Sequence, residues 1–406
     1  MQYNIAEYVN ITIRERRIMA GKRKSLKAVE AAKARKKQRS RKKRRAIILG
    51  LEIVILLLLM GTAFVMAKYD KFQTVAIDAD DIMINEGVKQ EGYSTYILFG
   101  GDSREGQLEA GAHADTMIIV SLDNKTKEIR MASIYRDTLL EMMNQDYHKA
   151  NQAYFRGGPV EAINMLNKNL DLAIEDYATV DFKALADAID LLGGVEINVS
   201  DAEAKALNKY INETAKVAGK EAHPLSSGGT YTLDGPQAVT YARIRKLAGG
   251  DYKRTERQRV VIKAMFNKAK KMDIATLNSI IDTVFPQVST SLTLKELMAL
   301  TAQAPEYKLG DSAGFPVDKT DGTFNSAGSV VVALGHTENV DQLHKFLYPN
   351  DAEYEVSSVV QTISDNITYI TGVVRPAELD AQAAEEAATE EPVISTENIE
   401  TVSEEQ

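Results

Sequence analysis

The densest group of residues that could do chemistry is a run of arginines with one acidic residue and one amide. Arg243 and Arg245 are two residues apart, so an extended segment would project both side chains to the same side. Asp251, Arg254 and Gln258 follow at spacings of three and four, which on a helix places them on one face. Guanidinium groups at this density repel one another unless an anion lies between them, and their paired N–H donors match phosphate oxygens. The run therefore predicts a site for a phosphorylated ligand, and the alternative is a solvated basic helix.

Three shorter motifs place charged residues at the ends of strand-like segments. Asp102 and Arg104 lie in GGDSR, Asp115 lies in ADT and Arg136 lies in IYRDT. Loops at strand ends are favoured ligand sites in α/β sheets, and an arginine there can hold an anion. If Asp102 and Asp115 meet at one sheet edge, their carboxylates could hold Mg²⁺, which takes its other ligands from water and phosphate. Three alternatives stay open: a surface turn at Asp102, two unrelated loop acids, and a structural Arg136–Asp137 turn.

The elements that must position these residues are predicted from apolar periodicity. Runs rich in β-branched and apolar residues predict strands at Ser94–Phe99, Thr116–Leu122, Ile129–Ile134 and Val195–Val199. Helical spacing predicts helices within Pro159–Leu170, Asp181–Leu192, Ala202–Ala218 and Asp251–Met272. Their order predicts an α/β fold in three layers, with a sheet sandwiched by helices. Such a sheet could hold an apolar ligand tail, and a closed core is the alternative.

The N-terminal residues combine a strong positive charge with an apolar run. Residues 1–45 contain 17 Lys and Arg against three Glu, a net charge of +14 in a chain whose total is −8. Residues 46–67 are a 22-residue apolar run with one charged residue, Glu52, and about 20 apolar residues span a bilayer. Basic residues before the run predict a single transmembrane helix, a cytoplasmic N-terminus and a domain outside the cytoplasm. A cleaved signal peptide is the alternative. We expect the basic tail to meet anionic lipid headgroups and no nucleic acid.

The overall composition excludes several kinds of site. The 406 residues include no Cys, which excludes disulfides, thiolate metal sites and Cys nucleophiles. Five His residues leave little room for a His-based metal cage, and the absence of Trp excludes a Trp-lined sugar platform. The last thirty residues hold ten Asp and Glu and no Lys or Arg. Residues 376–406 are therefore predicted to form a disordered acidic tail.

At these motifs the chain resembles the LytR–CpsA–Psr family of wall-polymer ligases. The resemblance runs from about Ser94 to Lys271 and is carried by YILFGGDSR, ADTMIIVSLD, ASIYRDT, KANQAYFRGGP, ATVDFKALADAIDLLGGVEINV, YTLDGPQAVTYARIR and GGDYKRTERQR, in that order. It implies a phosphotransferase that moves a glycopolymer, of the teichoic acid or capsule polysaccharide kind, from undecaprenyl pyrophosphate to peptidoglycan. It also implies an apolar groove that holds the polyprenyl chain between the sheet and its helices.

The resemblance implies a role for each motif residue of the predicted site. Asp102 and Asp115 would hold Mg²⁺, or alternatively Mn²⁺, on the pyrophosphate. Asp251 would be the catalytic base and Gln258 would complete the pocket. Arg243 and Arg245 are predicted to act in catalysis as well as in binding, and the full set of predicted pyrophosphate-binding arginines is Arg104, Arg136, Arg243, Arg245 and Arg254.

Three positions depart from the family pattern. His113 and Leu140 stand where the family offers arginine, and Tyr135 stands where proline is usual. These departures bear on donor preference and rate more than on the class of reaction.

The predicted organisation has six parts: a basic cytoplasmic tail (1–45), a transmembrane helix (46–67), a linker and stalk (68–93), a catalytic domain (94–284), a C-terminal extension packed on or near the core (285–375) and the acidic tail (376–406). Other functions remain open beside the ligase. A polyprenyl-pyrophosphate hydrolase would use the same pocket with water as the acceptor. A non-catalytic protein could bind the lipid pyrophosphate and regulate polymer export. An adhesin or sensor ectodomain would need no buried arginine cluster.

Overall fold

The computed structural model describes residues 73–75, 77–101, 108, 111, 113–324, 327–351 and 353–381. They belong to one compact unit, Asp70–Gln406. The predicted basic tail (1–45) and transmembrane helix (46–67) lie outside the described residues, as does most of the predicted acidic tail. Among the residues that are described, no helix combines the length and the apolarity that crossing a membrane requires.

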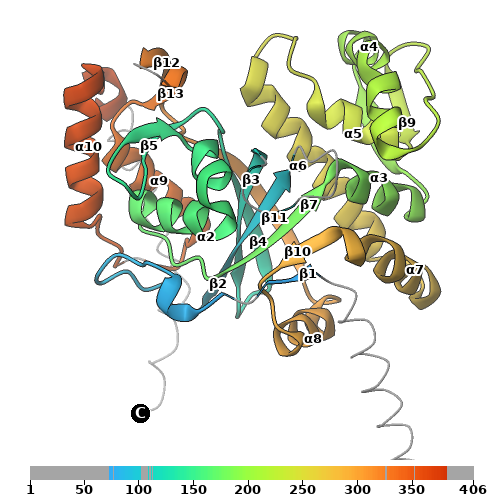
Figure 1. Cartoon of the computed structure of the whole chain (residues 1–406), viewed down its shortest axis with the longest axis horizontal. Helices are drawn as coiled ribbons and strands as arrows, with labels where there is room; N and C mark the ends of the chain where they lie inside the picture. The colour runs from blue at the N-terminus through green and yellow to red at the C-terminus, as the bar shows by residue number, and fades with distance from the viewer. Residues whose placement is uncertain are drawn as a thin grey trace, which may run out of the picture. The chain divides into compact units, whose positions relative to one another are not determined.

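A seven-stranded mixed sheet forms the centre of this unit (Figure 1). In spatial order its strands are β1 (Gln73–Thr74), β10 (Val288–Thr290), β7 (Asp176–Asp181), β2 (Tyr93–Gly101), β3 (Ala114–Asp123), β4 (Glu128–Ile134) and β11 (Lys308–Phe315). The pairs β1–β10, β7–β2 and β4–β11 are parallel, and the other neighbours are antiparallel. The strands predicted at Ser94–Phe99, Thr116–Leu122 and Ile129–Ile134 are confirmed as β2, β3 and β4.

One face of the sheet packs against helices in a closed core. The helices α2 (Asn151–Leu170), α9 (His336–Leu347) and α10 (Ser358–Thr371) lie on this side (Figure 1). Alternate residues of two strands point into this core: Ile97 and Phe99 of β2, and Met117 and Ile119 of β3. Each of these four side chains is at most 1% exposed.

The opposite face carries the helices that reach the candidate site. These are α3 (Phe182–Leu191), α5 (Gly235–Arg243), α6 (Gly250–Ala269) and α7 (Ile274–Val284) (Figure 1). A second core joins α3, α5 and α6 to α4 (Asp201–Ala218) and to the hairpin of β8 (Val195–Val199) and β9 (Gly229–Leu233). Asp181, Ser200 and Asp234 cap α3, α4 and α5 by accepting a hydrogen bond from a first-turn N–H. The four predicted helices are confirmed within α2, α3, α4 and α6.

Residues after α7 contribute to the central sheet itself. The short helix η2 (Phe285–Gln287) leads into β10, and α8 (Leu294–Gln303) leads into β11. The hairpin of β12 (Lys319–Phe324) and β13 (Gly328–Ala333) follows. It reaches the neighbourhood of the candidate site, because Val331 N donates to the Asp137 carbonyl at 2.8 Å and the Tyr252 hydroxyl donates to Asp321 at 2.6 Å. The remaining elements are η1 (Ala79–Asp81), β5 (Leu139–Glu141) and β6 (Tyr147–Lys149).

Two buried histidines attach α9 to the last turn of α2. Nε2 of His336 lies 2.8 Å from the Asn169 carbonyl oxygen, and Nε2 of His344 lies 2.8 Å from the Leu170 carbonyl oxygen. Because a carbonyl oxygen can only accept, both Nε2 atoms carry the proton. Burial lowers the pKa of His336 to about 4, and it also lowers the pKa of His344. Both imidazoles are therefore neutral in the folded chain at neutral pH.

We expect acidification to destabilise the fold through these histidines. The unfolded chain takes up a proton on His336 near pH 6.5, whereas the folded chain does so only near pH 4, so stability is complete above pH 6.5 and is lost below it. The loss for His336 is on the order of 3 kcal/mol at pH 4. The free energy of unfolding can be measured in urea from pH 7 to 4. His336→Gln should reduce its fall between pH 6.5 and 4, while His113→Gln, at an exposed position, should not. An unchanged slope in His336→Gln would contradict the assignment.

Candidate active site

Asp115 and Arg136 come together because β3 and β4 are antiparallel. Ile118 of β3 pairs with Ser133 of β4. Continuing this register past the end of β4 brings Arg136 opposite Asp115. Nη1 of Arg136 donates a hydrogen bond to Oδ1 of Asp115 at 2.7 Å. The sheet register therefore pairs these two side chains at the edge of the sheet formed by the strand ends, where β3 begins and β4 finishes.

The turn between α5 and α6 delivers three more charged side chains to this edge. Gly249 and Gly250 have φ values of 84° and 47°, a region that favours glycine because it has no Cβ. They let the chain turn sharply into α6, which lacks a side-chain cap. Asp251 and Arg254 then lie one helical turn apart, and Nη2 of Arg254 donates to Oδ2 of Asp251 at 3.0 Å. Arg245 lies in the turn before them.

Asp115 lies at the centre of the resulting cluster. Nη2 of Arg245 donates to Oδ2 of Asp115 at 2.7 Å, and Nη1 of Arg254 lies 3.7 Å from the same oxygen. Nη2 of Arg254 also donates to the Asp115 carbonyl oxygen at 2.9 Å. Burial alone would raise the pKa of Asp115, but the guanidinium groups of Arg136, Arg254 and Arg245 together lower it below its ordinary value. Asp115 is therefore an ionised carboxylate whose two oxygens face three cations.

Arg254 is the most deeply buried of these cations, with 2% of its side chain exposed. Burial lowers the pKa of Arg254 to about 10, and its pair with Asp251 limits the fall, so it stays charged at neutral pH. Oδ1 of Asp251 lies 3.7 Å from Nε of Arg136 and 3.6 Å from Nε of Arg245. Asp137 lies 3.6 Å from Arg136 as well, but it also pairs with Lys149. Three carboxylates thus face three guanidinium groups and one lysine, and the site carries an excess of positive charge suited to an anion.

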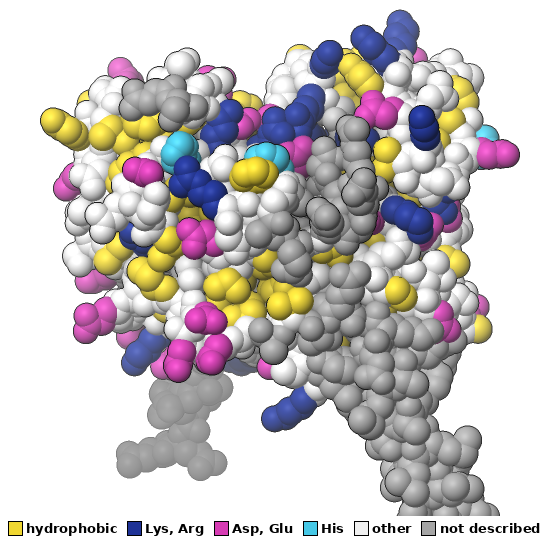
Figure 2. All heavy atoms as spheres, viewed as in Figure 1, with side chains coloured by type: hydrophobic (Ala, Val, Ile, Leu, Met, Phe, Trp, Pro, Cys, Tyr) yellow, Lys and Arg dark blue, Asp and Glu magenta, His cyan; other side chains and the backbone are white. Residues whose placement is uncertain are grey.

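Arg243 extends this positive charge into a polar cavity of about 270 Å³. Its Nη1 donates to Oγ1 of Thr214 at 3.2 Å, and its Cζ lies 4.5 Å from the centre of the Phe182 ring. We call Arg136, Arg243, Arg245 and Arg254 the guanidinium cluster. Figure 2 shows Lys and Arg side chains gathered at the top of the view, over the ends of β3 and α6. Of the predicted site residues, this polar cavity is lined by Asp115, Arg243, Arg245, Arg254 and Gln258.

A second, apolar cavity of about 420 Å³ lies beside the polar one. One wall is the sheet face opposite the closed core, formed by the alternate residues of the strands, such as Leu98, Ile118 and Ala178. The other wall comes from α3, α5, α6 and α7. The two cavities share Phe182, Arg243 and Gln258 as lining residues, so they are neighbours with a common polar boundary.

A single stripe of α6 lines both cavities. Its charged and polar members are Arg254 and Gln258, and it continues at helical spacing with Val261, Ile262, Met265, Phe266 and Ala269. The chemistry of the stripe therefore changes along the helix from guanidinium to hydrocarbon. At the change, Oε1 of Gln258 is shielded from solvent and has no hydrogen-bond partner among the described residues.

The structure brings most of the predicted site residues together. Asp115, Arg136, Arg245, Asp251 and Arg254 form one network of ion pairs, and Arg243 and Gln258 line the same polar cavity. The predicted metal ligand Asp102 and the predicted anion ligand Arg104 lie outside the described residues.

Two interpretations of the arginine run were wrong. Arg243 is not in an extended segment, because the capping box of Asp234 and Gln237 starts α5 and this helix continues to Arg243. The alternative of a solvated basic helix also fails, because Arg254 is buried. The alternative holds only for the exposed side of α6, where Glu256 pairs with Lys253 at 2.7 Å.

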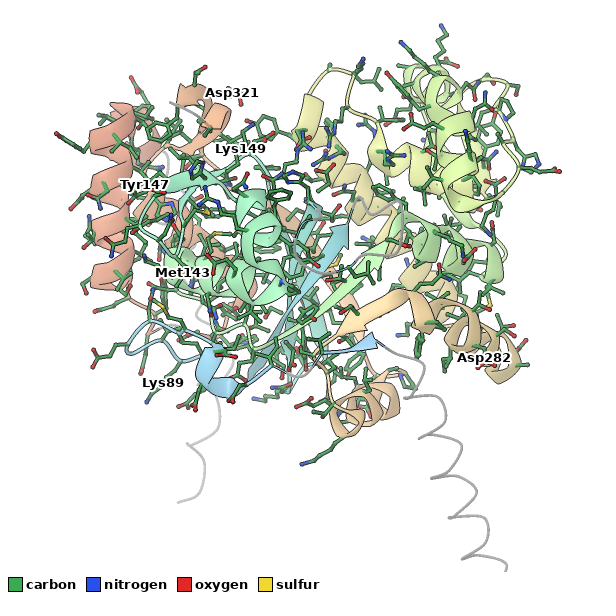
Figure 3. The ribbon with its side chains drawn as sticks, viewed as in Figure 1. Lys89, Met143, Tyr147, Lys149, Asp282 and Asp321 are labelled. Atoms are coloured by element: carbon green, nitrogen blue, oxygen red, sulfur yellow. The ribbon has the colours of Figure 1, made fainter. Side chains whose placement is uncertain are left out.

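The Arg136–Asp137 turn exists, but it is not the main contact of Arg136. Nε of Arg136 lies 3.6 Å from Oδ2 of Asp137, farther than its 2.7 Å contact with Asp115. Asp137 lies closer to Lys149, at 3.0 Å. Figure 3 labels Lys149 and also Asp321 of β12.

Several lining residues were missed in the sequence. Phe182 and Thr214 contact Arg243 from α3 and α4, and no local motif marks them. The apolar stripe of α6 could have been found, because it continues the spacing of the charged residues. Of the positions that depart from the family pattern, Leu140 is fully buried in the core, whereas His113 is exposed and stacks on Phe155 with ring centres 4.5 Å apart.

Residues 62–338 of the chain match the model of the LytR_cpsA_psr family. Among curated proteins, the chain is 30% identical over 222 residues to the polyisoprenyl-teichoic acid–peptidoglycan teichoic acid transferase TagV of Bacillus subtilis. This match covers 53% of the chain and 54% of TagV, so the chain spans about half the length of that relative.

Two solved structures share the fold. TagT bound to LIIa-WTA matches with a TM-score of 0.53 and 23% identity, over 67% of this chain and 97% of that one. A LytR-CPS2A-psr family protein, YwtF (TagT), with bound octaprenyl pyrophosphate lipid matches with a TM-score of 0.50 and 23% identity, over 67% of this chain and 99% of that one. At this identity the likeness shows a common α/β fold, with a central mixed sheet flanked by helices.

Proposed function

The chain belongs to the LytR_cpsA_psr family, and from this premise we propose that it is a phosphotransferase that moves a glycopolymer from a polyprenyl pyrophosphate to peptidoglycan. The proposed donor is undecaprenyl pyrophosphate that carries a teichoic acid or a capsule polysaccharide. The name of TagV, which describes a transfer of this kind, supports the proposal. The octaprenyl pyrophosphate lipid bound to the related YwtF (TagT) supports the choice of donor.

We also propose that the protein is a single-pass membrane protein with a cytoplasmic N-terminus and an extracytoplasmic catalytic domain. The support comes from the apolar run at 46–67 and the basic residues that precede it. An anchor would hold the site close to a donor whose own hydrocarbon chain is in the membrane. Peptidoglycan, the proposed acceptor, lies on the outer side of that membrane.

The observation that carries the proposal is the contact between the two cavities. A polyprenyl pyrophosphate joins a long hydrocarbon chain directly to a charged diphosphate. The apolar cavity and the guanidinium cluster offer the matching surfaces in the same order, with Phe182, Arg243 and Gln258 at their boundary. A protein that bound only a soluble phosphate would have no use for the apolar cavity.

In the proposed reaction, a hydroxyl of peptidoglycan attacks the phosphorus that carries the glycan. A phosphodiester bond forms, the bond from this phosphorus to the bridging oxygen breaks, and polyprenyl monophosphate leaves. Asp251 takes the proton of the attacking hydroxyl, because its carboxylate faces the cluster from the first turn of α6. The guanidinium cluster stabilises the charge that gathers on the phosphate oxygens.

Mg²⁺, with Mn²⁺ as the alternative, is the proposed cofactor, held by Asp102 and Asp115. Asp115 is an ionised carboxylate at the polar cavity, and Mg²⁺ is commonly held by one or two carboxylates together with substrate phosphates. Its two oxygens accept from Arg136 and Arg245, so the ion would have to take the place of one of these contacts. The bound ion would neutralise charge on the diphosphate and on the departing phosphate.

A transfer assay with the full chain in detergent tests the proposal. The donor is a short polyprenyl pyrophosphoryl oligosaccharide, the acceptor is a peptidoglycan oligomer, and mass spectrometry detects the joined product. We expect product formation to fall at least about tenfold with EDTA and with Arg245→Gln, because each change removes positive charge from the diphosphate. Arg130→Gln, which removes a cation that pairs with Glu128 on β4, is the matched control and should retain activity.

The same assay separates the alternative functions. Phosphate-terminated glycan formed without any joined product would support the hydrolase instead. Donor binding without turnover at any metal concentration would support a non-catalytic, regulatory protein. Either result would replace the ligase proposal.

A further inference from the structure

One wall of the polar cavity is formed by α4 and carries no arginine. Tyr210, Glu213 and Thr214 line the cavity from this helix. Their spacing of three and four residues places them on one face of α4. Thr214 fixes this face against the cluster, because its hydroxyl accepts the hydrogen bond from Arg243. The α4 wall, defined by Tyr210 and Glu213, therefore lies next to the guanidinium cluster.

The polar groups of the α4 wall have no partners in the described part of the chain. Glu213 is exposed and forms no ion pair with any described residue, although Arg243, Arg245 and Lys246 line the same cavity. The Tyr210 hydroxyl is shielded from solvent and has no hydrogen-bond partner among the described residues. Phosphate-binding chemistry does not explain Glu213, because a carboxylate repels a phosphate.

The lining of the two cavities follows an order that matches one kind of molecule. The apolar cavity comes first, the guanidinium cluster follows at the shared boundary, and the α4 wall lines only the polar cavity. A glycolipid diphosphate has the same order of parts: hydrocarbon, diphosphate and sugar. We propose that the α4 wall is a subsite for the sugar attached to the diphosphate, an inference that rests on the proposed function.

The side chains of the α4 wall indicate the class of sugar. An ionised carboxylate can only accept hydrogen bonds, and its two oxygens can accept from two neighbouring hydroxyl groups. A tyrosine offers an apolar ring face together with a hydroxyl that donates or accepts. The subsite therefore takes a pyranose with free neighbouring hydroxyl groups, which Glu213 binds as acceptor while Tyr210 contacts the ring.

Binding measurements with two probes test this subsite in the full chain in detergent. Geranylgeranyl pyrophosphate carries no sugar, and geranylgeranyl pyrophosphoryl-N-acetylglucosamine carries one. In the wild-type chain we expect the sugar to tighten binding about tenfold, as hydrogen bonds to a charged group do. Glu213→Ala should remove most of this gain and Tyr210→Phe part of it, and both should bind the sugar-free probe within twofold of wild type. Glu196→Ala, an exposed glutamate on β8, is the matched control and should keep the full gain.

Each other outcome has a definite meaning. If Glu213→Ala tightens the binding of both probes by the same factor, Glu213 acts only through its charge on the whole cavity, and the sugar subsite is wrong. If the wild-type chain binds both probes equally well, there is no sugar subsite at the α4 wall. If the wild-type chain binds neither probe, the proposed function itself fails, and the sugar-free probe is what identifies that case. Unfolding temperatures within about 2 °C of wild type would show that each variant is folded.

Discussion

Replacing Asp251 by Asn is expected to lower the rate of polymer transfer about a thousandfold while the donor still binds. A general base contributes roughly 10² to 10⁴ to a rate, and an amide in its place cannot accept the proton of the attacking hydroxyl. Asn has nearly the same shape as Asp and keeps an oxygen that can accept from Nη2 of Arg254, which now lies 3.0 Å from Oδ2. The check is single-turnover transfer together with the affinity for geranylgeranyl pyrophosphate, which should stay within a few-fold of wild type.

Asp137 provides the matched control for this substitution. It also lies beside Arg136, and it pairs with Lys149 at 3.0 Å. Asp137→Asn removes the same amount of negative charge from the same neighbourhood without removing the proposed base, so the rate should fall only several-fold. Equal losses in the two variants would mean that Asp251 contributes through the charge of the cluster, and the assignment as a base would be wrong.

The elements around this site were predictable because their signals are local. The strands β2, β3 and β4 follow from runs of β-branched and apolar residues, and α6 follows from the spacing of its charged residues. The meeting of Asp115 with Arg136 was also within reach, since consecutive strands commonly pair and side chains at their ends then lie together. The motif residues, taken with the family resemblance, identified the members of the ion-pair network.

The rest of the site depends on contacts between distant parts of the chain, which local patterns do not encode. Arg245 lies 130 residues from Asp115, and Thr214 reaches Arg243 only because α4 packs against α5. The helix α5 was not predicted, because Arg243 at its end and Arg245 just after it look like part of an extended segment when viewed alone. The apolar cavity is likewise a property of packing. Its existence depends on small side chains such as Ala178 on a sheet face that the helices do not close.

This last point leads to a substitution with a large expected effect on the lipid. Ala178 of β7 lies between Leu98 of β2 and Thr290 of β10, and its side chain borders the apolar cavity. Ala178→Phe would place an aromatic ring inside the space of about 420 Å³. Excluding roughly 100 Å² of hydrocarbon from a protein surface costs about 2.5 kcal/mol, which weakens binding nearly a hundredfold. We expect a loss of this size for geranylgeranyl pyrophosphate.

Inorganic pyrophosphate should bind Ala178→Phe as it binds the wild-type chain, because the guanidinium cluster is unchanged. Val260→Phe, on an exposed position of α6, introduces the same ring outside the cavity and should leave both affinities unchanged. Ala178→Phe should fold, since a strand accepts an aromatic residue well and the cavity has room for the ring. If Ala178→Phe binds the lipid within threefold of wild type, the hydrocarbon chain lies elsewhere. If the affinities for the lipid and for inorganic pyrophosphate fall together, the ring has disturbed the guanidinium cluster. The apolar and the polar cavity would then not be separate sites, and the assignment of the donor depends on that separation.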